Sequence, residues 1–216
     1  YRHISVATSL EQRFLMKELG FYTVAATLPA GAGCMGLSAQ FSGYGSYSDQ
    51  KYNLGYGRLF GEHFLAGISL AYVFQTTGGE TRPMHQVSYG IGTVIILSDK
   101  VNLAFNSFNP FQLYFRNSDY ANLPSVFRIC LSWQYSSDLL LLTECEKDLD
   151  LPPQWKAGIE YRAGDIFFIR GGIRLFPLSL AFGTAMRHQR FLFEFASCYH
   201  QVLGFTPQVS LQYDFK

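Results

Sequence analysis

Residues 125–137 read SVFRICLSWQYSS, and their side chains alternate between apolar and mainly polar. Successive side chains of a β-strand point to opposite faces of a sheet, so the stretch predicts a strand with two unlike faces. In a soluble β-sandwich the apolar face would form the core. In a membrane barrel that face would contact lipid and the polar face would line the lumen. The apolar face carries Phe127, Ile129, Leu131, Trp133 and Tyr135, and the other carries Val126, Arg128, Cys130, Ser132, Gln134 and Ser136.

The composition fits a barrel whose two faces differ. Charged residues make up 15% of the 216 residues, against about 25% in typical soluble domains. Aromatic residues reach 17%, and the net charge of +1 provides neither a basic surface for nucleic acid nor an acidic tail. The mean hydropathy is close to zero, as expected when apolar and polar residues alternate.

The same alternation recurs along the whole chain, in about fourteen segments of roughly ten residues, the length that a tilted strand needs to cross a bilayer. Residues 35–42 (MGLSAQFS), 64–74 (FLAGISLAYVF) and 208–215 (QVSLQYDF) show it clearly. The longest uncharged run, residues 20–48, is interrupted by Pro29 and by a Gly-Ala-Gly turn. It therefore cannot form a spanning helix.

The predicted connections alternate in length. Short ones lie around residues 31–33, 61–62, 98–99, 136–137, 163–164 and 188–189, and longer ones cover 11–20, 45–50, 76–83, 108–124, 146–153 and 200–207, with a tight exception near 176–177. Sorting of loops by parity is typical of outer-membrane barrels, with the short turns periplasmic and the longer loops extracellular. An open sheet in lipid would also leave unpaired backbone groups, so the sheet must close. We predict an all-β, transmembrane, antiparallel up-and-down β-barrel.

We expect residues 1–216 to form a single barrel domain. The chain opens with YRHISVATSL, which already alternates. We therefore expect that a signal peptide and any plug segment are absent from this chain.

Inward-facing charges are concentrated in the second half of the chain. Their signs are mixed, so neighbouring strands can pair them across the ladder. Two interpretations stay open: ion-paired rungs that hold the shape of the barrel, or a polar constriction that selects solutes. By parity the predicted lumen cluster comprises Arg128, Glu144, Glu146, Lys156, Glu160, Arg162, Arg170, Arg174 and Glu194, with Asp214 near the chain end.

The sequence indicates no catalytic or metal site. The five histidines are scattered, and neither a Ser-His-Asp spacing nor an HExxH motif is present. The four cysteines have no CxxC spacing, and small wall residues are their simplest interpretation. The glycine-rich stretch at residues 43–57 is interpreted as a loop between strands, and it precedes no helix that could bind phosphate. We predict a protein that is not an enzyme and has no cofactor.

The longest predicted loop, residues 108–124, reads FNPFQLYFRNSDYANLP. An aromatic-rich outer loop can fold back over the lumen as a lid, contact a partner, or simply pack locally. The lid or partner contacts that we predict are Phe108, Phe111, Tyr114, Phe115 and Tyr120.

Several stretches together resemble outer-membrane proteins of Bacteroidota. They are residues 28–47, 54–73, 108–111 (FNPF), 146–162, 168–173 (FIRGGI) and 196–216. The chain is similar to the PorV/PorQ group associated with type IX secretion, and more distantly to FadL-type transporters. The resemblance implies a fourteen-stranded barrel and no catalytic residues. Such proteins usually have an Asn-Pro-Ala-Gly-like motif before the first strand, and FadL relatives have an N-terminal plug. Both would lie ahead of the opening YRHISV, so whether the lumen is plugged stays open, and so does a transport function.

Two functions follow as hypotheses. The first is a non-enzymatic integral barrel of the bacterial outer membrane that acts as a subunit or accessory of a secretion or assembly complex. Its partners would be outer-membrane lipid and other outer-membrane or periplasmic proteins, with no nucleic acid. The alternative is a passive channel or FadL-like transporter for small solutes, hydrophobic ones included. The sequence does not identify the ligand or the partners.

Overall fold

The computed structural model describes residues 3–45, 47–76, 83–110 and 123–215. Fourteen strands and two short 3-10 turns account for nearly all of them. The strands are β1 (Ser5–Gln12), β2 (Gly20–Ala30), β3 (Gly33–Tyr44), β4 (Tyr47–Phe60), β5 (Phe64–Thr76), β6 (Met84–Ser98), β7 (Val101–Phe108), β8 (Val126–Gln134), β9 (Leu139–Asp148), β10 (Gln154–Ala163), β11 (Phe167–Leu175), β12 (Ser179–His188), β13 (Phe191–His200) and β14 (Gly204–Asp214).

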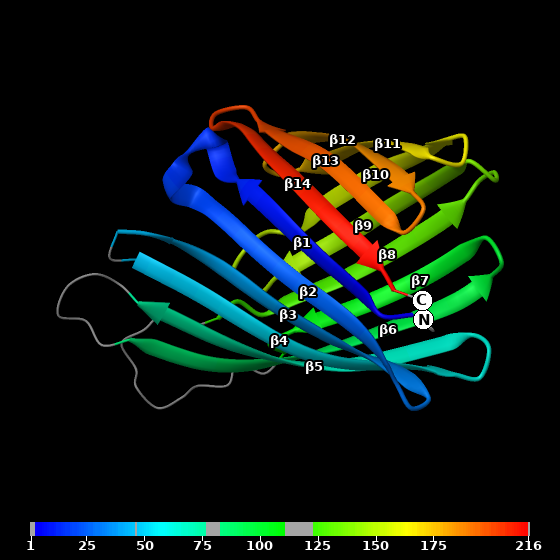
Figure 1. Ribbon diagram of the computed structural model, residues 1–216, viewed down its shortest axis with the longest axis horizontal. Coiled ribbons are helices and arrows are strands. Elements are labelled where there is room, and N and C mark those ends of the chain that lie inside the picture. Colours follow the sequence, from blue (N-terminus) through cyan, green and yellow to red (C-terminus); the bar gives the residue numbers. More distant parts are fainter. Residues whose placement is uncertain (1–2, 46, 77–82, 111–122, 216) are drawn as a thin grey trace.

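The strands form one closed antiparallel barrel in which each strand pairs with its neighbours in sequence. The first and last strands close it, with a register that runs from Ser5 opposite Asp214 to Glu11 opposite Gln208. Figure 1 shows β1 and β14 side by side, with both chain ends at the same rim. The predicted fold class and strand number are confirmed.

The two rims differ in their connections (Figure 1). The rim that holds the chain ends carries the short turns, and we call it the turn rim. The opposite loop rim carries the longer connections, among them η1 (Arg13–Leu15) and η2 (Lys17–Leu19) between β1 and β2. There η1 packs against β14, and the backbone N–H of Phe14 donates to Thr206 Oγ1 at 3.3 Å.

Two connections at the loop rim are shorter than predicted. β4 begins at Tyr47 and β14 begins at Gly204, so residues 45–50 and 200–207 belong largely to strands. In the first case Gly45 adopts a φ of 58°, which glycine tolerates without steric cost. This allows a tight connection between β3 and β4, and the glycine-rich stretch 43–57 is therefore mostly strand.

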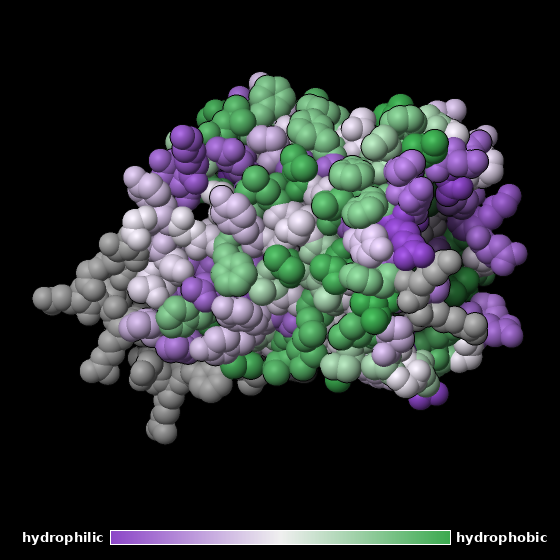
Figure 2. Space-filling model, in the orientation of Figure 1, coloured by the Kyte–Doolittle hydropathy of each residue, from purple (hydrophilic) through white to green (hydrophobic). Residues whose placement is uncertain are grey.

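The apolar face of the barrel is its outer face. In the strand of the opening stretch, Ile129 is 54% exposed and Trp133 is 44% exposed. Among the described residues, the buried hydrophobic side chains are only Ala71, Val73, Val126 and Ala185. Figure 2 shows hydrophobic residues over the middle of one outer face and the most hydrophilic ones toward its ends. The interior is thus not an apolar core, and the sandwich alternative is wrong.

Within the described ranges, no helix has the length and hydropathy needed to cross a membrane.

Candidate functional site in the barrel lumen

The charged wall of the lumen is built by β8 to β14. Alternation places one residue in two on the inner face, and the pairing register brings these residues level across neighbouring strands. Lys156, for example, lies opposite Glu144 on one side and Arg174 on the other. Most of the predicted inward charges therefore meet in two groups.

The first group, the Lys156 cluster, consists of Arg128, Cys130, Glu144, Glu146 and Lys156 on β8, β9 and β10. Lys156 Nζ donates to Glu144 Oε1 at 2.7 Å and to Glu146 Oε2 at 2.9 Å. Arg128 Nε donates to the same Glu146 oxygen at 2.6 Å. The Cys130 thiol donates to Glu144 Oε2 at 3.1 Å. Two cations and two carboxylates balance, so the cluster is neutral overall.

The second group, the Arg170 cluster, consists of Glu160, Arg170, Glu194 and Ser210. Arg170 Nε donates to Glu160 Oε2 and Nη1 to Glu194 Oε1, both at 2.6 Å. The Ser210 hydroxyl donates to the other Glu194 oxygen at 2.7 Å. With two carboxylates to one guanidinium, this cluster carries a net negative charge.

The remaining predicted lumen residues lie at the margins of these groups. Arg174 Nε donates to Ser179 Oγ at 3.0 Å. The guanidinium carbon of Arg162 lies 5.8 Å from the ring centroid of Phe168, with no ion pair among the described residues. Asp214 accepts a hydrogen bond of 2.6 Å from Ser5 and lies at the turn rim, apart from both clusters.

The ion-paired side chains are not packed away from water. Glu146 keeps 19% of its side-chain surface exposed, Lys156 keeps 32%, and Arg170 keeps 41%. A cavity of about 450 Å³ borders the Arg170 cluster and is also lined by Gly172, Ala181 and Gln208. Since these residues lie on the inner face of a closed barrel, the charged wall borders open space in the lumen.

The opposite wall, from β2 to β6, presents small side chains to the lumen. Ser38 Oγ accepts a hydrogen bond of 3.0 Å from Asn53 Nδ2 across β3 and β4. In mid-strand this wall carries no charged residue at its lumen-facing positions, so the two walls of the lumen are chemically unlike. These positions include Ala25, Gly36, Ser38, Asn53, Gly55, Gly67, Ser69, Gly90 and Gly92.

On the lumen face of β2 to β6, the charged residues are Asp49 and Lys51 of β4, and both lie at the loop rim. Lys51 Nζ lies 4.4 Å from the ring centroid of Phe108. These residues line a cavity of about 200 Å³ together with Phe21 and Gln75. Sequence reasoning does not find Asp49 and Lys51, because it interprets residues 43–57 as a loop. The signal was available, since both continue the parity of Asn53 and Gly55.

Phe108, which the sequence analysis assigns to the outer loop, is the last residue of β7. Its ring lies inside the lumen, next to Lys51. The other predicted lid or partner residues, Phe111, Tyr114, Phe115 and Tyr120, lie outside the described residues.

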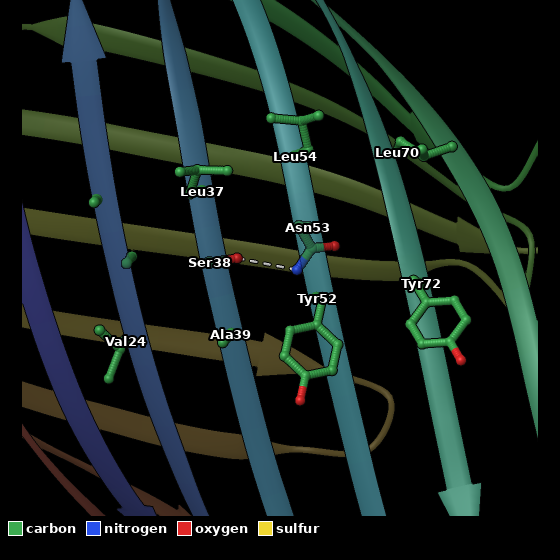
Figure 3. Close-up of a pocket in the computed structure, with 11 residues that line it drawn as sticks. Val24, Leu37, Ser38, Ala39, Tyr52, Asn53, Leu54, Leu70 and Tyr72 are labelled. Carbon is green, nitrogen blue, oxygen red and sulfur yellow. Dashed lines mark hydrogen bonds between the residues drawn. The ribbon is translucent and has the colours of Figure 1, made fainter.

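The outer face carries an apolar hollow of about 450 Å³ over β2 to β5. Leu37, Leu54 and Leu70 come from three successive strands, and Tyr52 and Tyr72 lie on the same side of them (Figure 3). The Tyr72 hydroxyl is hydrogen-bonded to His85 Nδ1 at 2.6 Å. The hollow exists because small residues such as Ala39 stand between these larger ones.

Nothing in the described ranges resembles a metal centre. No group of three or more His, Cys, Asp or Glu side chains converges there. All four cysteines are free thiols.

No protein-family model matches the chain, and no curated protein matches it in sequence. Solved structures do match. The outer-membrane protein Omp33 of Acinetobacter baumannii has a TM-score of 0.65 at 8% identity, covering 99% of this chain and 98% of that one. A FadL homologue of Pseudomonas aeruginosa has a TM-score of 0.63 at 10% identity, covering 99% and 89%.

A mutant of TodX, named a monoaromatic hydrocarbon channel, has a TM-score of 0.62 at 9% identity, covering 98% of this chain and 88% of that one. Identities this low show the fold alone. The chain thus has the fold of outer-membrane β-barrels.

Proposed function

We propose that this protein is an integral outer-membrane channel that lets small polar solutes pass along the charged wall of its lumen. The observation that carries this proposal is the exposure of the ion-paired side chains inside a closed barrel, from 19% for Glu146 to 41% for Arg170. Space beside charged groups is hydrated space, and hydrated space through a membrane is what a polar solute requires.

The outer face supports the membrane location. Leucine, isoleucine and phenylalanine side chains cover it, and aromatic residues such as Trp133 and Trp155 are more than two-fifths exposed. Exposed apolar surface of this extent is unfavourable in water and favourable in hydrocarbon. Closure of the sheet satisfies the backbone groups that lipid could not.

The known channels among the structural neighbours support a channel more than a complex subunit. TodX is named a monoaromatic hydrocarbon channel, and another neighbour, KdgM, is a porin solved with an oligogalacturonate. For this chain we favour polar solutes, because its lumen wall carries ion pairs. An apolar solute would have to displace water from those charges and could offer them no hydrogen bonds in return.

Liposome swelling tests the proposal. Purified protein is reconstituted into vesicles loaded with an impermeant polymer, which are diluted into iso-osmotic solutions of neutral sugars of increasing size. We expect swelling with small sugars and a cut-off as the solute grows. Swelling no faster than that of empty vesicles for every solute would show that the lumen is not a passage.

The second candidate is a subunit of an envelope complex of Bacteroidota, as the resemblance to the PorV/PorQ group implies. The observation that favours it is the outer apolar hollow beside Leu54 and Leu70, which offers an uneven face to a partner. Native mass spectrometry of the protein extracted in mild detergent tests it. Detection of the protein with stoichiometric protein partners would support the subunit function. Detection of the protein alone, or with lipid only, would count against it.

A further inference from the structure

One contact reaches across the inside of the barrel. Lys51 lies on β4 and Phe108 on β7, with β5 and β6 between them in the wall. Even so, Lys51 Nζ stands 4.4 Å from the Phe108 ring centroid, within the range of a cation–π contact. The two side chains must therefore extend over the inner surface of the intervening strands.

Inner-face residues of β5 and β6 near this contact are buried. Val73, which pairs with Lys51 in the register, is 4% exposed. Ala71 and Ser88, which pair with each other on β5 and β6, are 2% and 0% exposed. The residue that pairs with Phe108 on β6 is Gly90, which has no side chain to hold the ring away from the wall.

This side of the lumen contrasts with the charged wall. There the side chains of the Lys156 and Arg170 clusters keep between 19% and 41% of their surface exposed. The inner wall of β5 and β6 is thus buried near Lys51, whereas the charged wall of β8 to β14 is partly exposed. Lys51 lies at the edge of the buried part and lines the cavity at the loop rim.

The Lys51 ammonium has two charged neighbours. It interacts electrostatically with Asp49 on its own strand and with Arg128 of the Lys156 cluster. Arg128 is bound by Glu146 at 2.6 Å. Among the described residues, no hydrogen bond or ion pair within 4 Å holds the Lys51 ammonium.

We propose that Lys51, held over Phe108, narrows the lumen at the loop rim and disfavours the passage of small cations. This inference rests on the proposed channel function. A positive charge at a constriction raises the local concentration of anions and lowers that of cations. A cation–π contact to a single ring is also weak enough for the side chain to move when a larger solute arrives.

Single-channel recording in planar lipid bilayers tests the proposal, with potassium chloride as the probe. Lys51→Met keeps the length of the side chain and removes its charge. We expect a reversal potential in a salt gradient that shifts toward cation selectivity, because the charge that disfavours potassium is gone. Lys51→Arg keeps the charge and the contact with the ring, so it should restore the wild-type reversal potential.

Two further variants sharpen the test. Phe108→Leu removes the ring and leaves Lys51 charged. The conductance should therefore change, while the reversal potential should shift less than it does in Lys51→Met. Lys147→Met is the matched control, because Lys147 lies near the same rim and by parity on the outer face of β9. Each variant is first shown to be folded by a difference in gel migration between unheated and heated samples. Its channel currents are recorded afterwards.

The outcomes separate the two proposals. A wild-type barrel that passes no current overturns the channel function, and this inference with it. A wild-type barrel that conducts, with Lys51→Met and Lys147→Met both indistinguishable from it, overturns only the role of Lys51. A shift in Lys51→Met that Lys51→Arg reverses supports that role.

Discussion

Arg170 on β11 and Glu194 on β13 are joined by a hydrogen-bonded ion pair of 2.6 Å that passes over the intervening strand β12. The register places Gly183 of β12 directly opposite Arg170, where a larger side chain would stand in the path of the guanidinium. A contact of this kind ties three strands together on the inner face. It depends on the pairing register, which places the glycine of β12 beside Arg170.

We predict that Gly183→Ala destabilises the barrel. An added Cβ would lie 3.1 Å from the Phe195 carbonyl oxygen and 3.3 Å from the Ala196 Cβ, so these neighbours would have to move by a few tenths of an ångström. Overpacking of this kind costs about 1 kcal/mol or more. Gly172→Ala is the matched control, since its nearest contacts would be an ordinary 3.5 and 3.8 Å. Urea unfolding should show a lower free energy of unfolding for Gly183→Ala and an unchanged one for Gly172→Ala. Equal unfolding midpoints for the two variants would contradict the prediction.

The Arg170–Glu194 pair should show only a modest coupling energy. Both side chains keep exposed surface, 41% and 30%, and water screens their attraction. A double-mutant cycle with Arg170→Met and Glu194→Gln should give about 0.5–1 kcal/mol, as for partly exposed pairs. The Arg13–Glu11 pair at the loop rim, with 46% and 30% exposure, is the comparison and should couple no more strongly. A coupling above about 3 kcal/mol would mean that the lumen is dry at this level.

Thiol labelling should distinguish the two faces of the wall. Cys130 lies on the lumen face, hydrogen-bonded to Glu144, whereas Cys145 pairs with Ile129 and Trp155 of the outer face. Variants that keep only one of these cysteines are reconstituted in vesicles and treated with a membrane-impermeant, charged methanethiosulfonate reagent. We expect modification of Cys130 and protection of Cys145. The reverse pattern, read by mass spectrometry, would rule out a water-filled lumen.

The opening stretch gives a direct test of orientation. Leu131→Arg puts a charge on the outer face, where a cation near the middle of a bilayer costs about 2–4 kcal/mol. Ser132→Arg puts the same charge into the lumen and should cost much less. Folding efficiency into lipid vesicles, measured by gel mobility, should fall for the first variant only. Equal losses would show that the outer face does not contact lipid at this depth.

Much of the fold could be predicted because alternation is a local property. Whether Ile129 and Arg128 lie on opposite faces depends only on the strand between them, and the same holds for Lys156, Glu160 and Arg170. Parity alone therefore predicts which charged residues line the lumen. Loop lengths were less certain, as residues 45–50 show, because a single glycine with positive φ can replace a loop by a tight turn.

What the sequence determined by itself is a closed barrel with an apolar outer face and a lumen charged along its second half, because those features follow from a period of two and from the need to satisfy every backbone group. The tertiary structure alone decided which charges meet. Register and closure set the distances from Arg170 to Glu194 and from Lys51 to Phe108, and both contacts pass over intervening strands. The alternation of residues along a strand does not indicate which side chains on other strands a given side chain contacts.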